Sequence, residues 1–514
     1  MAGLDKIVLN SINPGLTIDH IKTDIRTDFA LAPHFNAIFN SNSNELWRKT
    51  SELLKSGNYV PNLPYTFNVP KEGGFTRPGS ILSPIDRFIY QALIDNVLPI
   101  LEEQLDRKRT FSNVLVTDRQ GIFKPAHDSW KSFQDRITEL CQLEGFILKA
   151  DIANYFERIP QHHLINLMSA AGCQPEIVKL LEEMLLAFQE RNSFGIIQGL
   201  FPSDILGNFF LSDFDAYCEL NDIPSARYVD DIYMYFQTEP AARKGLIDLI
   251  ERLRKNGLHL NELKSGIRTT KDIIREETEI DELFEQARDT IQDELDELES
   301  MGYGFAATWE SSENIDSEDS EINLAAVEKL YGAIEDFPAQ ADKIEKFCLP
   351  ILRSAGSNAA VDYVVENLLS KPHLTRLHHS YLSRFVSGDK NLQNSLESFM
   401  KSENLITGYE KMYILGSLFK GKNIQRDNVN LAIRWLKDTT IEEETRAMAA
   451  IFAAKHGIAT QKREVRLSYE NEPSEYVRSA ILYSARFLTT PEKRTCKKAW
   501  GGHSFVNTLI AHSI

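Results

Sequence analysis

Two adjacent carboxylates interrupt an apolar run near the middle of the chain. Asp230 and Asp231 lie within ARYVDDIYMYF, where apolar and aromatic residues alternate around the pair. This alternation predicts a hairpin of two short strands with both carboxylates at its tip. Aspartate is also a common turn residue, so the pair alone is equally typical of an ordinary hairpin.

A third carboxylate ends another short apolar run upstream. Asp151 closes the segment FILKAD, which is typical of a buried strand. A carboxylate at the edge of such a strand is costly unless a cation compensates its charge. Three of them at the ends of neighbouring strands would form an all-oxygen site suited to Mg²⁺ or Mn²⁺. Two such ions about 3.5–4 Å apart can activate a 3′-hydroxyl and stabilise a leaving pyrophosphate.

The elements that would position these carboxylates lie in the first half of the chain. Residues 1–280 mix short apolar runs bounded by Gly, Pro or Asp with longer segments of helical periodicity. The clearest helical segments are residues 87–105, 175–190 and 242–257. The mixture predicts an α+β domain that carries the candidate site.

The second half of the chain is typical of helices alone. Residues 281–325 begin as an acidic amphipathic helix and continue as a Ser-rich acidic linker. Residues 326–514 contain short segments with apolar positions at i, i+3, i+4 and i+7. We therefore expect three parts, namely the domain 1–280, the linker 281–325 and an all-helical domain 326–514 resembling degenerate HEAT repeats.

Composition narrows the functional classes. The net charge of −17 over 514 residues argues against a protein that coats duplex nucleic acid, but leaves room for a small basic channel. The sequence contains no run of about 18 apolar residues, so we expect no membrane span. The N-terminus lacks the pattern of a signal peptide. The five scattered cysteines predict reduced thiols in a cytoplasmic protein, with neither a disulfide framework nor a zinc site.

Five short motifs resemble those of reverse transcriptases and follow one another in that family's order. They are RPGSILSPIDRFIYQAL (77–93) for the first fingers motif, DIANYF (151–156) for motif A, QGLFPSDILGN (198–208) for motif B, YVDD (228–231) for motif C and GLHLNELKS (257–265) for motif D. The resemblance implies a right-hand-like fingers and palm fold and a two-metal transfer of nucleotides from dNTPs.

The resemblance assigns the metal site and a sugar gate. Asp151, Asp230 and Asp231 would hold two Mg²⁺ or Mn²⁺ ions, and the Ile152 carbonyl would be a further ligand. Phe156 stands where the family keeps an aromatic ring beneath the sugar, which implies a preference for dNTPs over rNTPs. Without the motif, Phe156 would be interpreted as a core residue.

Four more residues acquire roles from the resemblance. Gln198 and Gly199 would shape the floor of the nucleotide pocket, and Arg77 would neutralise triphosphate oxygens. Lys264 would supply a proton or a charge to the leaving pyrophosphate. Arg77 and Lys264 are otherwise typical of solvated surface residues.

The motifs depart from those of template-copying enzymes in several places. Ile197 precedes the Gln-Gly pair where Pro is usual, and Asp204 follows Ser203 where Pro is common. The segment 111–120 lacks the Arg that is expected soon after its Ser, Ser112. No basic, duplex-gripping thumb follows motif D, because an acidic segment leads directly into the helical half, so we expect no ordinary thumb.

A reverse transcriptase half joined to a helical half resembles the bacterial abortive-infection (Abi) polymerases of the AbiK and AbiA type, and the chain most resembles the prophage-encoded kind. That resemblance implies phage defence by template-independent, protein-primed DNA synthesis. It further implies a single-stranded DNA product attached to the protein and a homo-oligomer, a trimer or a hexamer.

A protein primer requires a hydroxyl that enters the palm. Tyr59 and Tyr65, in the Pro- and Asn-rich segment 56–70, are the candidates from the sequence, although most such tyrosines are simply packed. Two alternatives stay open. One is an RNA-templated reverse transcriptase working with a dedicated non-coding RNA, and the other is a non-catalytic helical scaffold.

Overall fold

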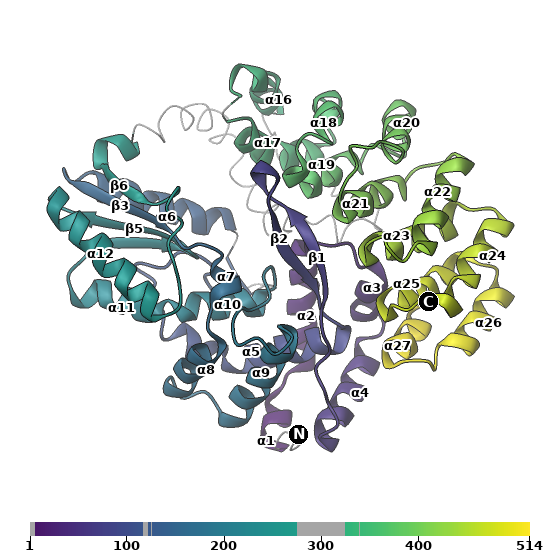
Figure 1. The fold of residues 1–514 in the computed structure, drawn as a ribbon, viewed down its shortest axis with the longest axis horizontal. Helices are drawn as coiled ribbons and strands as arrows, with labels where there is room; N and C mark the ends of the chain where they lie inside the picture. The colour runs from purple at the N-terminus through teal and green to yellow at the C-terminus, as the bar shows by residue number, and fades with distance from the viewer. Residues whose placement is uncertain (1–5, 117–121, 125, 275–323, 339) are drawn as a thin grey trace. The chain divides into compact units, whose positions relative to one another are not determined.

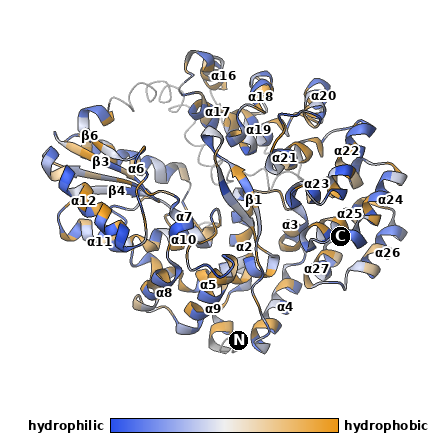
Figure 2. Cartoon of the chain, in the orientation of Figure 1, coloured by the Kyte–Doolittle hydropathy of each residue, from blue (hydrophilic) through white to orange (hydrophobic). Residues whose placement is uncertain are grey.

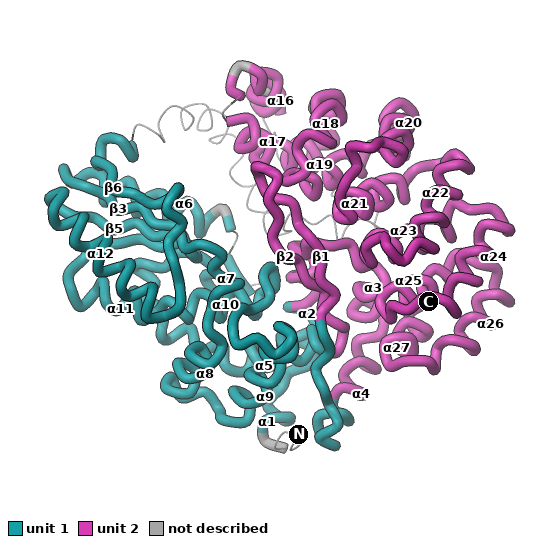
Figure 3. The backbone as a smooth tube through the Cα atoms, in the orientation of Figure 1, with its two compact units in different colours: residues 1–20, 51–63, 86–300 teal, residues 21–50, 64–85, 301–514 magenta. Residues whose placement is uncertain are grey.

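The computed structural model describes residues 6–116, 122–124, 126–274, 324–338 and 340–514. The predicted acidic helix and linker, 281–325, lie almost wholly outside these described residues. The chain forms two compact units (Figure 3). Unit 1 comprises residues 1–20, 51–63 and 86–300, and unit 2 comprises residues 21–50, 64–85 and 301–514.

Unit 1 is built on a four-stranded antiparallel sheet (Figure 1). Its strands are β3 (Phe146–Asp151), β4 (Ser225–Tyr228), β5 (Asp231–Phe236) and β6 (Gly266–Thr269), in the order β4-β5-β3-β6. The predicted hairpin is confirmed, because β4 and β5 are adjacent and antiparallel. The strand predicted before Asp151 is confirmed as β3 and pairs with β5.

Helices form most of the remainder of unit 1. The helices of unit 1 that follow Pro84 are α5 (Pro84–Glu102), α6 (Ala126–Cys141), α7 (Tyr155–Arg158), α8 (Gln161–Ala170), α9 (Pro175–Phe188), α10 (Phe201–Phe210), α11 (Ser212–Leu220) and α12 (Glu239–Lys255). The helices predicted at 87–105, 175–190 and 242–257 correspond to α5, α9 and α12.

The alternation of β5 sends its side chains to two buried faces. Tyr233 packs with Phe133 and Ile137 of α6 in one apolar cluster. On the other face α12 lies close to β5, since a Cβ on Gly245 would stand only 2.2 Å from the Phe236 ring. Period-two alternation thus fixes the register of the strand that begins with Asp231.

Unit 2 contains two rows of short helices (Figure 1). The inner row is α17 (Ala341–Ala355), α19 (Thr375–Leu382), α21 (Gly408–Leu418), α23 (Glu443–His456), α25 (Glu475–Ser484) and α27 (Phe505–Ser513). The outer row is α16 (Leu324–Gly332), α18 (Val361–Asn367), α20 (Lys390–Phe399), α22 (Arg426–Lys437), α24 (Ala459–Leu467) and α26 (Thr490–Trp500). Each inner helix packs on the next, and the helices carry both polar and apolar segments (Figure 2).

Two N-terminal segments also belong to unit 2. The hairpin of β1 (Tyr65–Pro70) and β2 (Thr76–Ile81) packs against α21, and α3 (Pro33–Ser41) packs against α25 and α27. The prediction cut the chain at single points, whereas the units interleave segments distant in sequence. The fold is mixed α and β and rich in helix, and the HEAT-like character of residues 326–514 stays a prediction. Among the described residues, none of the helices combines the length and apolarity that a membrane span requires.

Candidate active site

Strand pairing brings the three predicted carboxylates to one edge of the sheet. Asp151, the last residue of β3, is the register partner of Asp231, the first residue of β5. Asp230 lies in the two-residue turn that joins β4 to β5. The other turn residue, Val229, has φ of 56°, a left-handed conformation that a β-branched residue rarely adopts. The backbone of this turn is therefore held in place by its surroundings.

Burial and like charges destabilise the ionised carboxylates. Burial, followed by the charge of Asp231, raises the pKa of Asp230 from 3.8 to about 6. Burial, followed by the charge of Asp151, also raises the pKa of Asp231. Lys264 offers partial compensation, with its Nζ 3.6 Å from Asp151 Oδ1, but its side chain is 67% exposed. The site therefore favours an additional cation.

The predicted motif D segment forms hydrogen bonds with the last residue of β3. The Asn261 amide donates to the Asp151 carbonyl at 2.8 Å, and the Asp151 amide donates to Ser265 Oγ at 3.1 Å. Ile152 forms an isolated antiparallel bridge with Leu260, in which the neighbouring residues make the hydrogen bonds. The Ile152 carbonyl consequently points away from Leu260. Its predicted role as a metal ligand stays a prediction.

The donor set fits hard divalent cations in its chemistry. Carboxylate oxygens are the ligands that Mg²⁺ and Mn²⁺ prefer, and burial, followed by the neighbouring negative charges, raises the pKa values of Asp230 and Asp231. Within the described ranges, however, no three His, Cys, Asp or Glu side chains are arranged to hold one metal ion. Binding of a cation would therefore have to draw these three side chains together.

The predicted gate residue packs against motif B. Phe156 is buried in α7, and a Cβ on Gly207 of α10 would stand 3.0 Å from its ring. The neighbouring Tyr155 hydroxyl donates to the Gly207 carbonyl at 2.6 Å. Glycine at 207 thus allows the ring to approach the helix backbone closely. A core role and a gate role are both compatible with this position.

Gln198 and Gly199 lie just before α10. Gly199 has φ of 84°, which glycine adopts without strain, and Gln198 is half-buried. The turn at Gly199 is followed by Leu200, the N-terminal cap of α10. Their contribution to a nucleotide pocket stays a prediction.

Arg77 and the candidate priming tyrosines each contact other side chains. Arg77 lies on β2 in unit 2, with its Cζ atom 4.4 Å from the centroid of the Phe29 ring. Burial lowers the pKa of the Arg77 guanidinium. The buried Tyr59 hydroxyl donates to Asp86 Oδ1 at 2.6 Å, and burial raises its pKa well above the usual value. Tyr65 packs on Tyr476 with ring centroids 4.7 Å apart. The roles predicted for these three residues stay predictions.

A buried arginine that sequence reasoning missed supports the carboxylate turn. Arg227 of β4 is 1% exposed and binds Asp215 in bidentate fashion, at 3.1 Å through Nε and 2.5 Å through Nη2. Its Nη1 donates to the Val229 carbonyl and to Asn208 Oδ1, both at 3.1 Å. The Val229 amide in turn donates to Ser112 Oγ at 3.0 Å. The only signal in the sequence was a cation inside a strand-like run.

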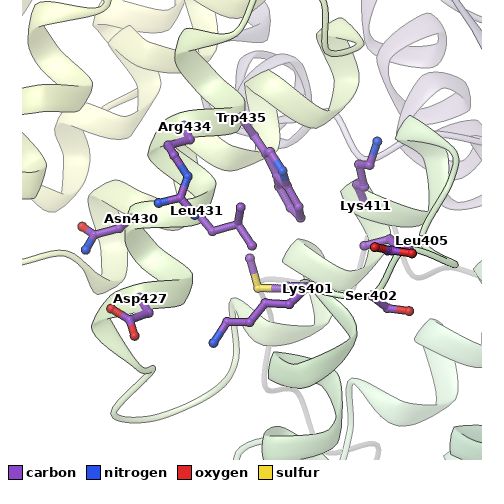
Figure 4. A pocket seen from close by; sticks show the side chains of 11 residues that line it. Lys401, Ser402, Leu405, Lys411, Asp427, Asn430, Leu431, Arg434 and Trp435 are labelled. Carbon is purple, nitrogen blue, oxygen red and sulfur yellow. The ribbon is translucent and has the colours of Figure 1, made fainter.

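A cavity of about 570 Å³ lies in unit 2 between the end of α20, α21 and α22 (Figure 4). It contains none of the predicted palm residues. Its lining mixes cations, carboxylates and one indole, namely Lys401, Glu403, Lys411, Asp427, Arg434 and Trp435 with their neighbours.

Comparison with known protein families finds a match for one segment of the chain. Residues 69–302 match the family described as reverse transcriptase (RNA-dependent DNA polymerase). This segment contains all of the motif residues named above, and it is a reverse transcriptase family domain of the polymerase type. No curated protein sequence matches the chain.

The solved structures that match the chain include fungal telomerases. The telomerase of Candida tropicalis in complex with a fragment of telomeric RNA is 12% identical with a TM-score of 0.32, covering 72% of this chain and 65% of its own. The corresponding Candida albicans complex is 12% identical with a TM-score of 0.31, and the match covers 83% of this chain and 66% of the telomerase chain. Apo telomerase from Candida tropicalis is 12% identical with a TM-score of 0.31, covering 88% and 73%. The chain thus spans about two thirds of the first of these proteins, and likeness at this level carries no functional argument.

Proposed function

We propose that this chain is a DNA polymerase with a reverse transcriptase domain, which transfers deoxynucleotides from dNTPs with two Mg²⁺ or Mn²⁺ ions in bacterial defence against phage. One observation carries the enzymatic part of the proposal. Asp151 and Asp231 are register partners at the edge of the sheet, with Asp230 adjacent, inside a reverse transcriptase family domain. A non-catalytic scaffold would have no need to bury three repelling carboxylates at one edge.

The chain's own residues would position the reactants. Asp151, Asp230 and Asp231 would hold the ions, which when bound supply positive charge for the transferring phosphoryl group and lower the pKa of the attacking hydroxyl. Lys264, exposed beside Asp151, would donate a charge or a proton to the departing pyrophosphate. The Phe156 ring, fixed against Gly207, would crowd a 2′-hydroxyl.

Template independence and protein priming are the finer parts of the proposal. Their support is the resemblance to Abi polymerases together with the departures at Ile197, Asp204 and segment 111–120. Tyr59 and Tyr65 remain the candidate primers. Tyr59 would first have to break its bond to Asp86, and Tyr65 would have to leave Tyr476. The same resemblance supports a cytoplasmic homo-oligomer, a trimer or a hexamer, with single-stranded DNA attached.

The second candidate function is RNA-templated reverse transcription with a bound non-coding RNA. The observation that favours it is the family match itself, since that family is described as RNA-dependent DNA polymerases. Both candidates use the same carboxylates and differ in what is copied and what is extended.

One experiment separates the two candidates. Nuclease-treated full-length protein is incubated with each labelled dNTP and Mg²⁺ or Mn²⁺, without template or primer, and resolved on a denaturing protein gel. The proposal predicts label that stays on the wild-type protein, is absent from Asp230→Asn/Asp231→Asn, and persists in Glu251→Gln, which removes an exposed carboxylate from α12. Label that appears only after a primed RNA is added would establish the RNA-templated alternative instead.

A further inference from the structure

A basic residue stands at the C-terminal end of five successive inner helices of unit 2. Arg353 lies in the last turn of α17, and Lys455 lies in the last turn of α23. Arg384, Lys420 and Arg486 each follow the last residue of their helix, α19, α21 and α25, by two positions. We call these five residues the basic row. The row is conspicuous in a chain whose net charge is −17.

At each end of the basic row, side-chain contacts link one inner helix to the next. At the α17 end, the Arg384 guanidinium lies against Gly356, the cap of α17, where a Cβ would stand 3.2 Å from Arg384 Nη2. The Arg384 side chain, which follows α19, therefore reaches the end of the preceding inner helix, α17.

At the α25 end, aromatic rings link the cations. Lys455 Nζ donates to the Phe419 carbonyl at 2.7 Å and stands 3.6 Å over the Phe419 ring. That ring meets Phe487 with centroids 5.8 Å apart, and Arg486 Cζ lies 5.6 Å from the Phe487 ring. The cations of α23 and α25 thus rest on a shared aromatic surface.

Electrostatics agree with this geometry. Burial, followed by the charges of Arg353, Arg384 and Lys455, lowers the pKa of Lys420 to about 8. Burial, followed by the charge of Arg384, lowers the pKa of Arg353 to about 10. Cations from four different helices are therefore near enough to repel one another.

Helix ends alone do not explain this repulsion. A cation at a helix C-terminus is stabilised by the macrodipole, and it is stabilised in the same way when it is solvated and distant from other cations. Gathering the cations into one partly buried file concentrates positive potential along one line, and such a potential attracts an anionic ligand. A carboxylate also lies in this region, because the charge of Glu397 acts on His456. Its Oε2 accepts hydrogen bonds from the Gln425 backbone amide and from the Asn428 side-chain amide.

We propose that the basic row binds the phosphate backbone of a single nucleic-acid strand. Each inner helix contributes one cation, and neighbouring packed helices are about 8–10 Å apart, so the cations of the basic row follow one another at regular intervals. Such a row suits a nucleic-acid strand, which carries one negative charge per nucleotide. A single file suits one backbone rather than the two of a duplex. Single-strand binding sites elsewhere combine such cationic tracks with aromatic rings, and Phe487 keeps part of its surface exposed here.

The proposal goes beyond the polymerase activity and is tested without it. Fluorescence anisotropy measures binding of labelled dT20 and rU20 to the full-length protein in EDTA, with no dNTP present. The test variant is Arg384→Gln/Lys420→Gln/Arg486→Gln. The matched control, Lys390→Gln/Arg426→Gln/Arg494→Gln, removes three exposed cations from α20, α22 and α26 of the outer row.

We expect the test variant to lose about 30-fold in affinity, with the slope of log K against log salt reduced by about 2, since each single-strand phosphate contact contributes about 0.7. The control should bind as the wild type does. Comparison of dT20 with rU20 shows which strand the row prefers. Because partly buried Lys420 can disturb folding, Arg384→Gln/Arg486→Gln gives a second variant, and Lys420→Arg should retain binding.

Three results would overturn the proposal. Equal affinity of test variant and control would mean that the cations serve only the helix ends. Duplex DNA bound as tightly as dT20 would exclude a single-strand site. Competition by poly-glutamate without any binding of dT20 or rU20 would identify an acidic protein segment as the ligand. None of these results bears on the palm, since no nucleotide is transferred in the assay.

Discussion

Replacing Asp230 by Asn removes a buried charge that the metal-free protein compensates only in part. The folded-state pKa of Asp230 is about 6, against 3.8 for a free side chain. The folded protein therefore binds a proton that the unfolded chain releases between about pH 4 and pH 6. Stability from this group is complete below pH 4 and is lost as the pH rises through 6.

The size of the effect follows from the shift. One pKa unit corresponds to about 1.4 kcal/mol, so a shift of about two units gives about 3 kcal/mol as an upper limit. Contact of the turn with solvent reduces this figure, and we expect about 2 kcal/mol. In EDTA at pH 8, Asp230→Asn should therefore be more stable than the wild type. The difference should shrink towards pH 4.

Thermal unfolding between pH 4 and pH 8 measures this difference, with Glu251→Gln as the control for loss of an exposed carboxylate. Adding Mg²⁺ at pH 8 should raise the unfolding midpoint of the wild type more than that of Asp230→Asn. A variant that is less stable than the wild type at every pH would refute the reasoning. It would mean that Asp230 is needed for its hydrogen bonds and that its charge is not a source of strain.

Three further predictions concern neighbouring residues. Arg227→Met, which leaves the Asp215 carboxylate buried without its cationic partner, should cost about 3–5 kcal/mol of stability and weaken Mn²⁺ binding, measured by thermal unfolding and by paramagnetic resonance. Phe156→Ala should raise incorporation of rNTPs relative to dNTPs in single-nucleotide assays, and an unchanged ratio would assign Phe156 to the core alone. Lys264→Met should lower kcat at least tenfold with little change in KM, because the role proposed for Lys264 is realised as pyrophosphate leaves.

Local patterns were sufficient to predict the strands that carry the carboxylates. Period-two alternation defined β5, and an apolar run ending in Asp151 defined β3. Asp151 ends β3 and Asp231 begins β5, so antiparallel pairing of these two strands brings both carboxylates to the same rim of the sheet. The helices α5, α9 and α12 were also predictable from local sequence, because their apolar positions recur with the helical period.

What escaped prediction depends on contacts between distant segments. Arg227 is recognisable as a turn anchor only when Asp215 and Asn208 are placed beside it by two helices. Residues 21–50 and 64–85 join the C-terminal helices through packing that no local period reports. The basic row likewise exists only once the inner helices are aligned, because each helix contributes a single cation.

Release of pyrophosphate from dNTPs tests the central claim most directly, because every mode of nucleotide transfer produces it whatever the template or primer. Purified full-length protein is supplied in parallel with no template, with single-stranded DNA and with primed RNA, each with Mg²⁺. The account predicts Mg²⁺-dependent pyrophosphate in at least one of these reactions. It also predicts none from an Asp230→Asn/Asp231→Asn variant whose unfolding shows it to be folded. Pyrophosphate released equally by that variant, or by neither protein in any reaction, would contradict the assignment of these carboxylates to catalysis.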